Sequence, residues 1–513
     1  MCIRDRLKHL KNSKQDKCLH YIALEKYPLS PDAILELISR YPELKEYGEE
    51  LINTYPPAVE GSHTRQLFDN RVVIHYKFMD ACRALGSECF NVDAWYLDGF
   101  SPAKNIDMWS EDLMLKLAQN SHKDTTCSTY TAAGFVRRNL QNAGFTVNRV
   151  KGYGKKREML VASFDLDNKI IYKYVDKPWF APPLHVNVSD KKAAIIGAGI
   201  AGLSVAYSLV KRGWHITLID RHDDVAKETS GNPAVIVYPR LSVNNDVDTE
   251  FYTDAYCYNL HVLEMLQKNH SSRFWLNCGL LQLTDNKRIS EIISKFDFNE
   301  DFVSIYNKSL NLGDDENGQK VYAEYKTAGV VLPRVLCDVL KQECGEHLNL
   351  VQADITDIKK TDNLWSCFSG DELISKDNIL VLANGTGIND FGLSSYLPVE
   401  SIRGQVSVFD ESLRSHVINK VINADKHITP SIDNKHYLGA TYSRGISCLE
   451  VNPEESSELF EAVNAMLPDV LDQNDYVKSW VGFRAMSKDR VPIIGALPDS
   501  KFFYDEYADM SHG

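Results

Sequence analysis

The sequence lacks the features that mark zinc-binding, secreted and membrane proteins. Its eleven cysteines are scattered and odd in number, and none forms a Cys-x-x-Cys pair. This excludes a standard zinc finger and argues against a secreted disulfide framework, so we expect a reducing, cytoplasmic setting. Charged residues interrupt residues 1–14, which therefore do not predict a signal peptide. No metal-binding or Ser-His-Asp pattern is readable, and we expect no metal.

The composition is that of an ordinary soluble, folded protein. The 513 residues are 44% hydrophobic and 25% charged, and their number predicts two to four domains. One uncharged run, residues 193–210, reaches the minimum length of a membrane span. It contains three glycines, which would be costly inside a helix. We therefore expect no membrane partner.

Charge is divided unevenly along the chain. Residues 1–180 contain 26 Lys and Arg against 23 Asp and Glu, whereas residues 181–513 contain 31 against 47. A polyanion such as RNA is therefore expected to meet the first part. Within it, residues 128–157 contain no acid and seven basic residues: Arg137, Arg138, Arg149, Lys151, Lys155, Lys156 and Arg157. A solvated helix face and a hairpin turn would give the same pattern, so composition alone leaves both interpretations open.

The first segment alternates strand and helix patterns. Strands are predicted at 20–24, 72–78, 92–97 and 125–130, and a terminal hairpin at 145–150 and 159–164. Helices are predicted from Pro31, after Ser110 and over 132–142. This alternation predicts a mostly parallel sheet that binds ligands beyond the carboxyl ends of its strands. Three acids follow such ends: Glu25, Asp80 and Asp98.

A proline-rich stretch, residues 178–183, interrupts this pattern (Pro-Trp-Phe-Ala-Pro-Pro). We expect a first domain over residues 1–175, a linker over 176–190 and a second domain over 191–513.

The second domain begins with the pattern of a dinucleotide-binding turn. A buried strand at 193–196 is followed by Gly197-Ala-Gly199-Ile-Ala-Gly202, an amphipathic helix, and a strand that ends in Asp220. Gly197 permits the tight turn, Gly199 lets the backbone approach a pyrophosphate, and Gly202 lets helix and strand pack closely. The helix N-terminus offers N–H groups to phosphates, and Asp220 can accept hydrogen bonds from a ribose.

The turn alone leaves FAD and NAD open, and later residues favour a flavin. Ser230 and Asn232 follow the second strand, where they could line another face of the cofactor. A buried strand at 379–383 ends in a small-residue turn, as in flavin enzymes. Arg403 and Arg484 lie in further glycine-containing motifs. A structural ion pair is the commoner fate of an arginine, but these motifs favour Arg484 as a clamp for a substrate carboxylate.

Longer motifs resemble one known family. The motifs are His20-Tyr-Ile-Ala-Leu-Glu25, Asp93-Ala-Trp-Tyr-Leu-Asp98-Gly-Phe-Ser-Pro102 and Thr131-Ala-Ala-Gly-Phe-Val-Arg-Arg138. Together with the dinucleotide turn, they resemble the bifunctional tRNA 5-methylaminomethyl-2-thiouridine biosynthesis proteins (the MnmC family). The resemblance covers nearly the whole chain. It implies an α/β chain in which a Rossmann-like methyltransferase domain precedes an FAD-binding Rossmann domain of the glycine and D-amino-acid oxidase type, with an interleaved α+β substrate subdomain.

The resemblance implies two reactions on the wobble uridine of tRNA. With FAD, the oxidase would remove the carboxymethyl group of a carboxymethylaminomethyl uridine, because hydride leaves the carbon next to nitrogen and water hydrolyses the imine. With S-adenosylmethionine, the methyltransferase would then methylate the aminomethyl group. Glu25 would hold the donor's ribose, and Asp80 would lie near its adenine. Asp98 would orient the acceptor amine.

Transfer RNA is therefore the expected partner. The residues expected to contact it are Arg137, Arg138, Lys155, Lys156 and Arg157 in the first domain and Arg403 in the second.

The chain departs from the family pattern in three places. Residues 1–18 contain no glycine where the family has a glycine-rich donor loop, Ile106 replaces a proline, and the chain ends shortly after Gly495. We therefore expect a methyltransferase domain and an oxidase domain that are each truncated. Two alternatives stay open: an oxidase of a small free amine or amino acid, and a tRNA-binding fragment without methyl transfer.

Overall fold

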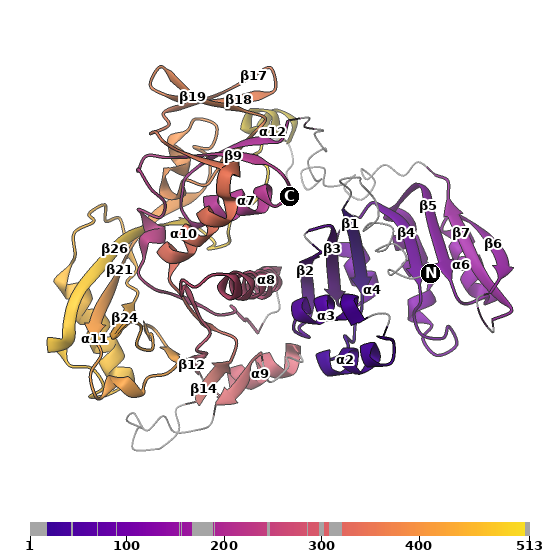
Figure 1. Cartoon of the computed structure of the whole chain (residues 1–513), viewed down its shortest axis with the longest axis horizontal. Coiled ribbons are helices and arrows are strands. Elements are labelled where there is room, and N and C mark those ends of the chain that lie inside the picture. The colour runs from indigo at the N-terminus through magenta and orange to yellow at the C-terminus, as the bar shows by residue number, and fades with distance from the viewer. Residues whose placement is uncertain are drawn as a thin grey trace. The chain divides into compact units, whose positions relative to one another are not determined.

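The computed structural model describes residues 18–166, 188 and 190–507, except 43–44, 69, 89, 153, 155, 244–246, 285, 297–301 and 307–320. The chain divides into two compact units, Met1–His185 and Val186–Gly513 (Figure 1). The predicted linker, residues 176–190, lies almost entirely outside the described residues.

The first unit contains two sheets, with orders β1-β3-β2 and β4-β5-β7-β6. Their strands are β1 (Leu19–Leu24), β2 (Gly61–Leu67), β3 (Val72–Phe78), β4 (Val92–Leu97), β5 (Ser121–Thr129), β6 (Phe145–Lys151) and β7 (Glu158–Phe164). The helices are α2 (Pro31–Ser39), α3 (Lys45–Thr54), α4 (Ala81–Ser87), α5 (Glu111–Gln119) and α6 (Gly134–Asn142).

The expectation of a mostly parallel sheet is wrong for this unit. Only β1 with β3 and β4 with β5 pair in parallel, whereas β2 with β3, β5 with β7 and β6 with β7 are antiparallel. Short turns join β2 to β3 and β6 to β7, and so short a connection requires an antiparallel pair. The turn between β2 and β3 uses the left-handed residues Phe68 and Asn70, with φ of 53° and 63°.

Local capping explains where the first helices begin. Ser30 Oγ accepts a hydrogen bond from the Ala33 amide at 3.2 Å at the start of α2, and Pro31 occupies the first turn. Ser110 caps α5 through the Leu113 amide at 3.3 Å. Both starts agree with the prediction, because a side-chain oxygen satisfies an amide that lacks a partner within the helix.

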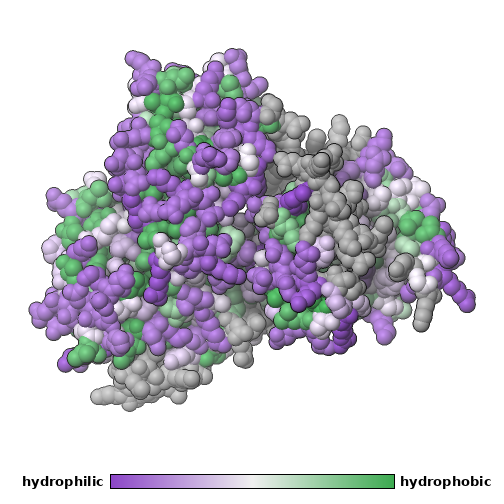
Figure 2. Space-filling view, in the orientation of Figure 1, coloured by the Kyte–Doolittle hydropathy of each residue, from purple (hydrophilic) through white to green (hydrophobic). Residues whose placement is uncertain are grey.

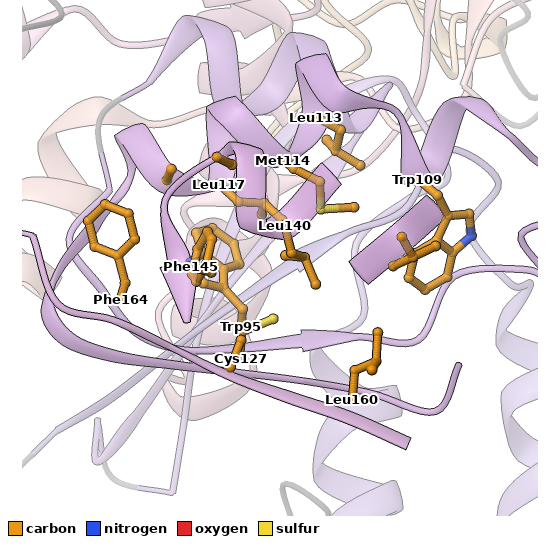
Figure 3. Close-up of a cluster of buried hydrophobic side chains, with 14 of the residues drawn as sticks. Trp95, Trp109, Leu113, Met114, Leu117, Cys127, Leu140, Phe145, Leu160 and Phe164 are labelled. Atoms are coloured by element: carbon orange, nitrogen blue, oxygen red, sulfur yellow. The ribbon is translucent and has the colours of Figure 1, made fainter. Parts of the chain in front are cut away.

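The second sheet of this unit packs against α5 and α6 (Figure 3). Leu113, Met114 and Leu117 from α5 meet Leu140 from α6 over a sheet face that includes Phe164, and all are at most 4% exposed. Burial of side chains this large stabilises the unit by roughly 1.5–3 kcal/mol each.

The second unit begins with a fully parallel sheet of order β16-β9-β8-β20. Its strands are β8 (Lys192–Ile196), β9 (His215–Asp220), β16 (Leu348–Gln352) and β20 (Ile379–Leu382), with α7 (Ile200–Val210) and α10 (Pro333–Cys344) packed together beside it (Figure 1). β8 and β9 are connected through α7, as a parallel pair requires.

A mixed sheet of nine described strands forms the other layer of this unit. Its strands are β12 (Leu280–Thr284), β13 (Ser304–Tyr306), β14 (Val321–Tyr325), β21 (Val399–Asp410), β22 (Val421–Asn423), β23 (His427–Ile428), β24 (Lys435–Gly439), β25 (Ser443–Arg444) and β26 (Tyr476–Ser487). The longest pairing joins β21 to β26, and α11 (Pro453–Met466) packs on β21.

Smaller elements complete the second unit. Two three-stranded sheets contain β10 (Val235–Val237), β11 (Trp275–Leu276), β15 (Gly329–Val331), β17 (Asp357–Thr361), β18 (Leu364–Ser369) and β19 (Glu372–Asp377). The remaining helices are α8 (Val247–Asn269), α9 (Asn286–Phe296) and α12 (Ser500–Tyr507).

The uncharged run at 193–210 forms β8, the glycine turn and α7 rather than one long helix. None of the helices in the described ranges combines the length and hydrophobicity that crossing a bilayer needs. The face in Figure 2 is largely hydrophilic, with scattered hydrophobic patches.

Candidate functional site

The glycine turn between β8 and α7 brings three backbone segments into close contact. Gly197 has a φ of 107°, and a Cβ there would lie 2.4 Å from the Ala383 carbonyl oxygen. A Cβ at Gly202 would lie 1.9 Å from the Gly197 carbonyl oxygen, and a Cβ at Gly199 would lie 3.0 Å from Ser230 Oγ. Positions 197 and 202 therefore require glycine.

Two side chains hold this turn in place. Asp220, at the end of β9, accepts hydrogen bonds from the Ala198 amide at 2.7 Å and the His222 amide at 2.9 Å. Ser230 Oγ accepts one from the Ile200 amide at 3.0 Å, at the N-terminus of α7. The structure thus brings Asp220 and Ser230 to the predicted dinucleotide turn. A ribose contact of Asp220 stays a prediction.

The surroundings of the turn fit a bound FAD. The Asn384 side chain lies just after β20, next to Gly197, and its Oδ1 is buried without a hydrogen-bond partner in the described part of the chain. An acceptor in that state is able to take a hydrogen bond from a bound group. Asn232 instead uses its side chain locally, because Oδ1 accepts from the Ala234 amide at 3.1 Å. The glycine cradle and the unsatisfied acceptor together can hold a dinucleotide.

A short 3₁₀ turn, Thr229–Gly231, connects the dinucleotide turn to β26. The Thr229 hydroxyl donates to the Phe483 carbonyl oxygen, one residue before Arg484. Since Ser230 contacts the start of α7, one short segment touches both α7 and the strand that carries Arg484. The structure therefore places Arg484 near the predicted cofactor site.

The Arg484 guanidinium lies against the backbone of Gly404 on β21. A Cβ at Gly404 would lie 2.4 Å from Arg484 Nη1, so the absence of a side chain at position 404 leaves room for the guanidinium. Arg484 Nη1 donates to the Thr441 carbonyl oxygen at 3.1 Å, and no carboxylate among the described residues pairs with it. Burial lowers the pKa of Arg484, although the nearby Tyr442 opposes the shift. A half-buried cation without an anion is prepared to bind one.

Arg403 does not support its predicted role in RNA binding. It is only 2% exposed and forms an ion pair with Glu455 on α11. Its guanidinium also donates to the carbonyl oxygens of Cys448 at 3.0 Å and Glu450 at 2.6 Å. Burial raises the pKa of Glu455, but hydrogen bonds from Ser443, Arg403 and Thr441 outweigh it and lower the pKa overall. We therefore correct this prediction, because a guanidinium enclosed in this way cannot reach RNA.

His427 was not predicted. It lies on β23, and a Cβ at Gly439 would lie 2.9 Å from its ring. Its Nε2 is buried without a hydrogen-bond partner among the described residues. Burial, and then the charge of Arg484, lower the pKa of His427 to about 4. No sequence pattern marks this residue, since its environment comes from strands far apart in the chain.

In the first unit, the predicted acids lie on two sheets. Glu25 and Asp80 follow the parallel neighbours β1 and β3, where Glu25 accepts from the Tyr27 amide at 2.8 Å. Asp80 caps α4 through the Cys82 amide at 2.9 Å. Asp98 follows β4 in the other sheet and is exposed.

Two aromatic residues hold the loop after Asp98. The Tyr130 hydroxyl donates to the Gly99 carbonyl oxygen at 2.9 Å, and Trp109 Nε1 donates to the Phe100 carbonyl oxygen at 2.8 Å. The Phe100 side chain itself is 73% exposed. The loop is thus fixed through its backbone and presents Asp98 and Phe100 to solvent. The sequence signal for Tyr130 is its place at the end of the predicted strand 125–130, directly after β5.

The predicted RNA-contacting residues of the first unit differ in their surroundings. Lys156 lies over the Tyr130 ring, with Nζ 5.0 Å from the centroid, and so is close to the loop of Asp98. Arg157 and Arg138 are exposed, whereas Arg137 buries its Nε, for which the described ranges provide no hydrogen-bond partner. Lys155 lies outside the described residues.

S-adenosylmethionine fits these residues only in part. The carboxylates predicted to bind it are present at strand ends, but the described residues of the first unit contain no glycine-rich turn like that at 197–202. Within the described ranges, no group of three or more His, Cys, Asp and Glu residues could hold a metal ion.

Comparison with protein families matches each unit separately. Residues 192–512 match the FAD-dependent oxidoreductases, and residues 42–165 match a family of S-adenosyl-L-methionine-dependent methyltransferases. The fold of the second unit is similar to glycine oxidase from Geobacillus kaustophilus (TM-score 0.51, 17% identity, 60% of this chain and 87% of that one). It is equally similar to L-proline dehydrogenase from P. horikoshii (TM-score 0.51, 17% identity, 60% and 85%).

Similarity over nearly the whole chain is found with bifunctional proteins that contain both parts. The tRNA 5-methylaminomethyl-2-thiouridine biosynthesis bifunctional protein MnmC of Pseudomonas fluorescens (strain Pf0-1) is 32% identical over 512 residues, which cover 96% of this chain and 76% of that protein. The MnmC protein of Ectopseudomonas mendocina (strain ymp) is 31% identical over 514 residues, 98% and 76% of the two chains. The chain belongs to the MnmC family.

Membership of the MnmC family confirms the resemblance and the predicted fold class. A methyltransferase domain precedes an FAD-dependent oxidoreductase domain, and the cofactors of these domains are S-adenosylmethionine and FAD. The roles of individual residues and the boundaries 175 and 191 stay predictions.

Proposed function

We propose that the second unit oxidises a carboxymethylamino group on the wobble uridine of tRNA, and that the first unit belongs to the methylation of the aminomethyl product. Arg484 carries the proposal for the oxidase. Its half-buried guanidinium has no carboxylate partner among the described residues and lies one short segment away from the dinucleotide turn. A substrate carboxylate would supply the missing anion.

The cofactor would be held by the glycine turn, the N-terminus of α7 and the side chains of Asp220 and Asn384. When bound, FAD supplies the acceptor for the hydride that leaves the carbon between nitrogen and the carboxylate. The protein's own task is then to position the substrate, and Arg484 does so by fixing the carboxylate.

We call the Arg484 guanidinium the carboxylate anchor, and its surroundings hold it in place. Gly404 leaves a flat surface below the guanidinium, and the Thr441 carbonyl oxygen accepts from one of its nitrogens. The remaining N–H groups can face a ligand. His427, with its lowered pKa, is neutral at pH 7 and so adds no second positive charge behind the anchor.

For the first unit, we propose that Asp98 binds the acceptor amine on its fixed loop. A carboxylate there orients the amine and stabilises positive charge that develops on nitrogen. Phe100 and Lys156 lie on or next to this loop and would meet the nucleotide. Because the described residues fit the methyl donor only in part, we derive no step of methyl transfer from them.

Flavin reduction tests the oxidase proposal. The purified protein should show flavin absorption bands, and anticodon stem-loop RNA with 5-carboxymethylaminomethyluridine should bleach them, whereas free glycine should not. Arg484→Gln should lower kcat/KM for this RNA by roughly a hundredfold, the equivalent of about 3 kcal/mol for a buried charge-assisted contact. The exposed Arg414, in the same unit, provides the control variant Arg414→Gln.

Two results would contradict the proposal. Reduction of the flavin by glycine but not by the RNA would favour an oxidase of small free amines. Equal kcat/KM values for Arg484→Gln and Arg414→Gln would remove Arg484 from the substrate site.

A further inference from the structure

The second unit carries a cluster of exposed arginines beside Arg484, although its part of the chain is acidic overall. The cluster consists of Arg240, Arg444 and Arg490 together with the two tyrosines that they contact, Tyr252 and Tyr442. It has no role in the proposed carboxylate contact, which needs one arginine.

The contacts form a continuous series across three segments of the chain. Arg444 and Arg490 both lie over the Tyr442 ring, with Cζ 5.9 and 5.8 Å from its centroid. The Tyr252 hydroxyl donates to the Arg490 carbonyl oxygen at 2.8 Å, and Arg240 lies 5.1 Å from the Tyr252 ring centroid. Separate segments thus converge on one patch.

The register of the sheet places this patch next to the anchor. Arg444 on β25 and Arg484 on β26 both pair with Ile402, on opposite sides of β21. Neighbouring strands are about 4.8 Å apart, so the two backbones are separated by roughly 10 Å. Tyr442 also follows Thr441, whose carbonyl oxygen accepts from Arg484.

The tyrosine rings hold the arginines in orientations that suit the binding of a phosphate. Stacking on a ring restricts a guanidinium before a ligand arrives, which reduces the entropy lost on binding. Arginine binds phosphate oxygens in pairs, and its weak hydration favours such contacts. Two acids are close: Glu400 acts on Arg444, and Asp489 caps the turn next to Arg490 through the Val491 amide at 3.0 Å. The three arginines outnumber these two acids.

We propose that Arg240, Arg444 and Arg490 form a phosphate-binding site for the RNA backbone next to the modified uridine. This rests on the proposed function, because a uridine whose side chain reaches Arg484 brings its own phosphates to this part of the surface. A small free amine would have no use for three further arginines. Tyr442 is 42% exposed, so the nucleotide can reach the patch from solvent.

The proposed site differs from the expectation drawn from charge along the chain. The net negative charge of residues 181–513 favours RNA contact in the first part of the chain. The nearby arginines, rather than the net charge of the segment, determine whether a phosphate binds at this surface. A phosphate responds mainly to charges within about one Debye length, roughly 8–10 Å.

RNA binding by the holoenzyme tests the site. The probe is an anticodon stem-loop RNA with 5-carboxymethylaminomethyluridine, titrated at several salt concentrations. Arg444→Gln/Arg490→Gln should weaken binding about tenfold or more and reduce the slope of log affinity against log salt by about 1.4, since each phosphate contact to a single strand contributes roughly 0.7. Arg414→Gln should leave both values unchanged.

Two further measurements separate this site from the carboxylate anchor and from folding. The ratio of kcat/KM for the RNA to kcat/KM for the free nucleoside should fall about tenfold in the double Gln variant, because the nucleoside has no phosphates. Arg444→Lys/Arg490→Lys keeps the charge, and so should keep the salt slope while binding the RNA more weakly than the wild type.

Each contrary outcome has a distinct meaning. If the wild type binds no RNA while the free nucleoside reduces its flavin, the proposed function on tRNA fails, and this site with it. If the wild type binds RNA and the double Gln variant has the same affinity and slope, the phosphate site alone is overturned. An equal loss for RNA and nucleoside would also overturn it, because the arginines would then serve the small reacting group.

Discussion

At the scale of single residues, two arginines on neighbouring strands have opposite environments. Arg403 is enclosed with Glu455, and removing one partner of such a buried pair costs about 3–5 kcal/mol. Arg484 has a carbonyl oxygen and a glycine surface but no carboxylate among the described residues. The ion pair of Arg403 stabilises the fold, whereas the guanidinium of Arg484 keeps N–H groups that can bind a ligand.

His427 predicts how the stability of the second unit depends on pH. Its pKa is about 4 in the folded protein against 6.5 for an exposed imidazole, so the unfolded chain binds a proton first as the pH falls. The contribution of His427 to the free energy of unfolding is therefore fully present above pH 6.5, and it is lost as the pH falls from 6.5 to 4. Thermal unfolding followed by flavin fluorescence should show this decrease, with a shallower slope in His427→Gln.

The exposed His347 supplies the matched control for that experiment. His347→Gln should retain the slope of the wild type. A wild-type midpoint that does not change from pH 6.5 to 4.5 would contradict the assigned burial of His427.

At the scale of elements, the middle of β21 combines structural and binding roles. Successive side chains of a strand point to opposite faces. Arg403 and Gln405 therefore point toward α11, where Gln405 donates to Ser456 at 2.8 Å, while Gly404 between them faces the Arg484 guanidinium. The motif Arg403-Gly404-Gln405 thus binds α11 on one face of the strand and leaves room for the Arg484 guanidinium on the other.

A methyl group at position 404 should disturb the anchor more than the fold. The Cβ of Gly404→Ala would lie 2.4 Å from Arg484 Nη1, and a long side chain can move away at little cost in stability. We expect KM for the carboxylate substrate to rise about tenfold or more, with flavin absorption retained. Gly392→Ala is the control, because a Cβ there meets no heavy atom within 4 Å.

Sequence predicted these elements well where the signal is local. The glycine turn, the caps Ser30 and Ser110, and the strands at 72–78 and 92–97 follow from short patterns. The antiparallel β2 was missed because polar residues alternate along it at positions that the fold buries. The environments of Arg403 and His427 depend on strands far apart in sequence, so no local pattern distinguishes the buried arginine from the free one.

At the scale of the whole molecule, the two units have separate cores and separate cofactors. The first core lies between α5, α6 and a four-stranded sheet, and the second unit builds its own cores around β8, β9 and β21. The division after His185 lies within the predicted linker. Units organised in this way can unfold independently.

Calorimetry should therefore show two transitions, of which added FAD shifts one. Ligand at a hundred times its dissociation constant stabilises the binding unit by about 2.7 kcal/mol, and the other unit gains nothing. A single transition that moves as a whole with FAD would show that the two units unfold together and would contradict this division.

The alternation along β21 also limits how this region can evolve. Insertion or deletion of one residue before position 403 would exchange the two faces of the strand. The arginine of the ion pair would then turn to the ligand side, and the glycine below Arg484 would be replaced by a bulky neighbour. Substitutions can adjust this strand one property at a time, whereas a change in its length would remove stability and substrate recognition in a single event.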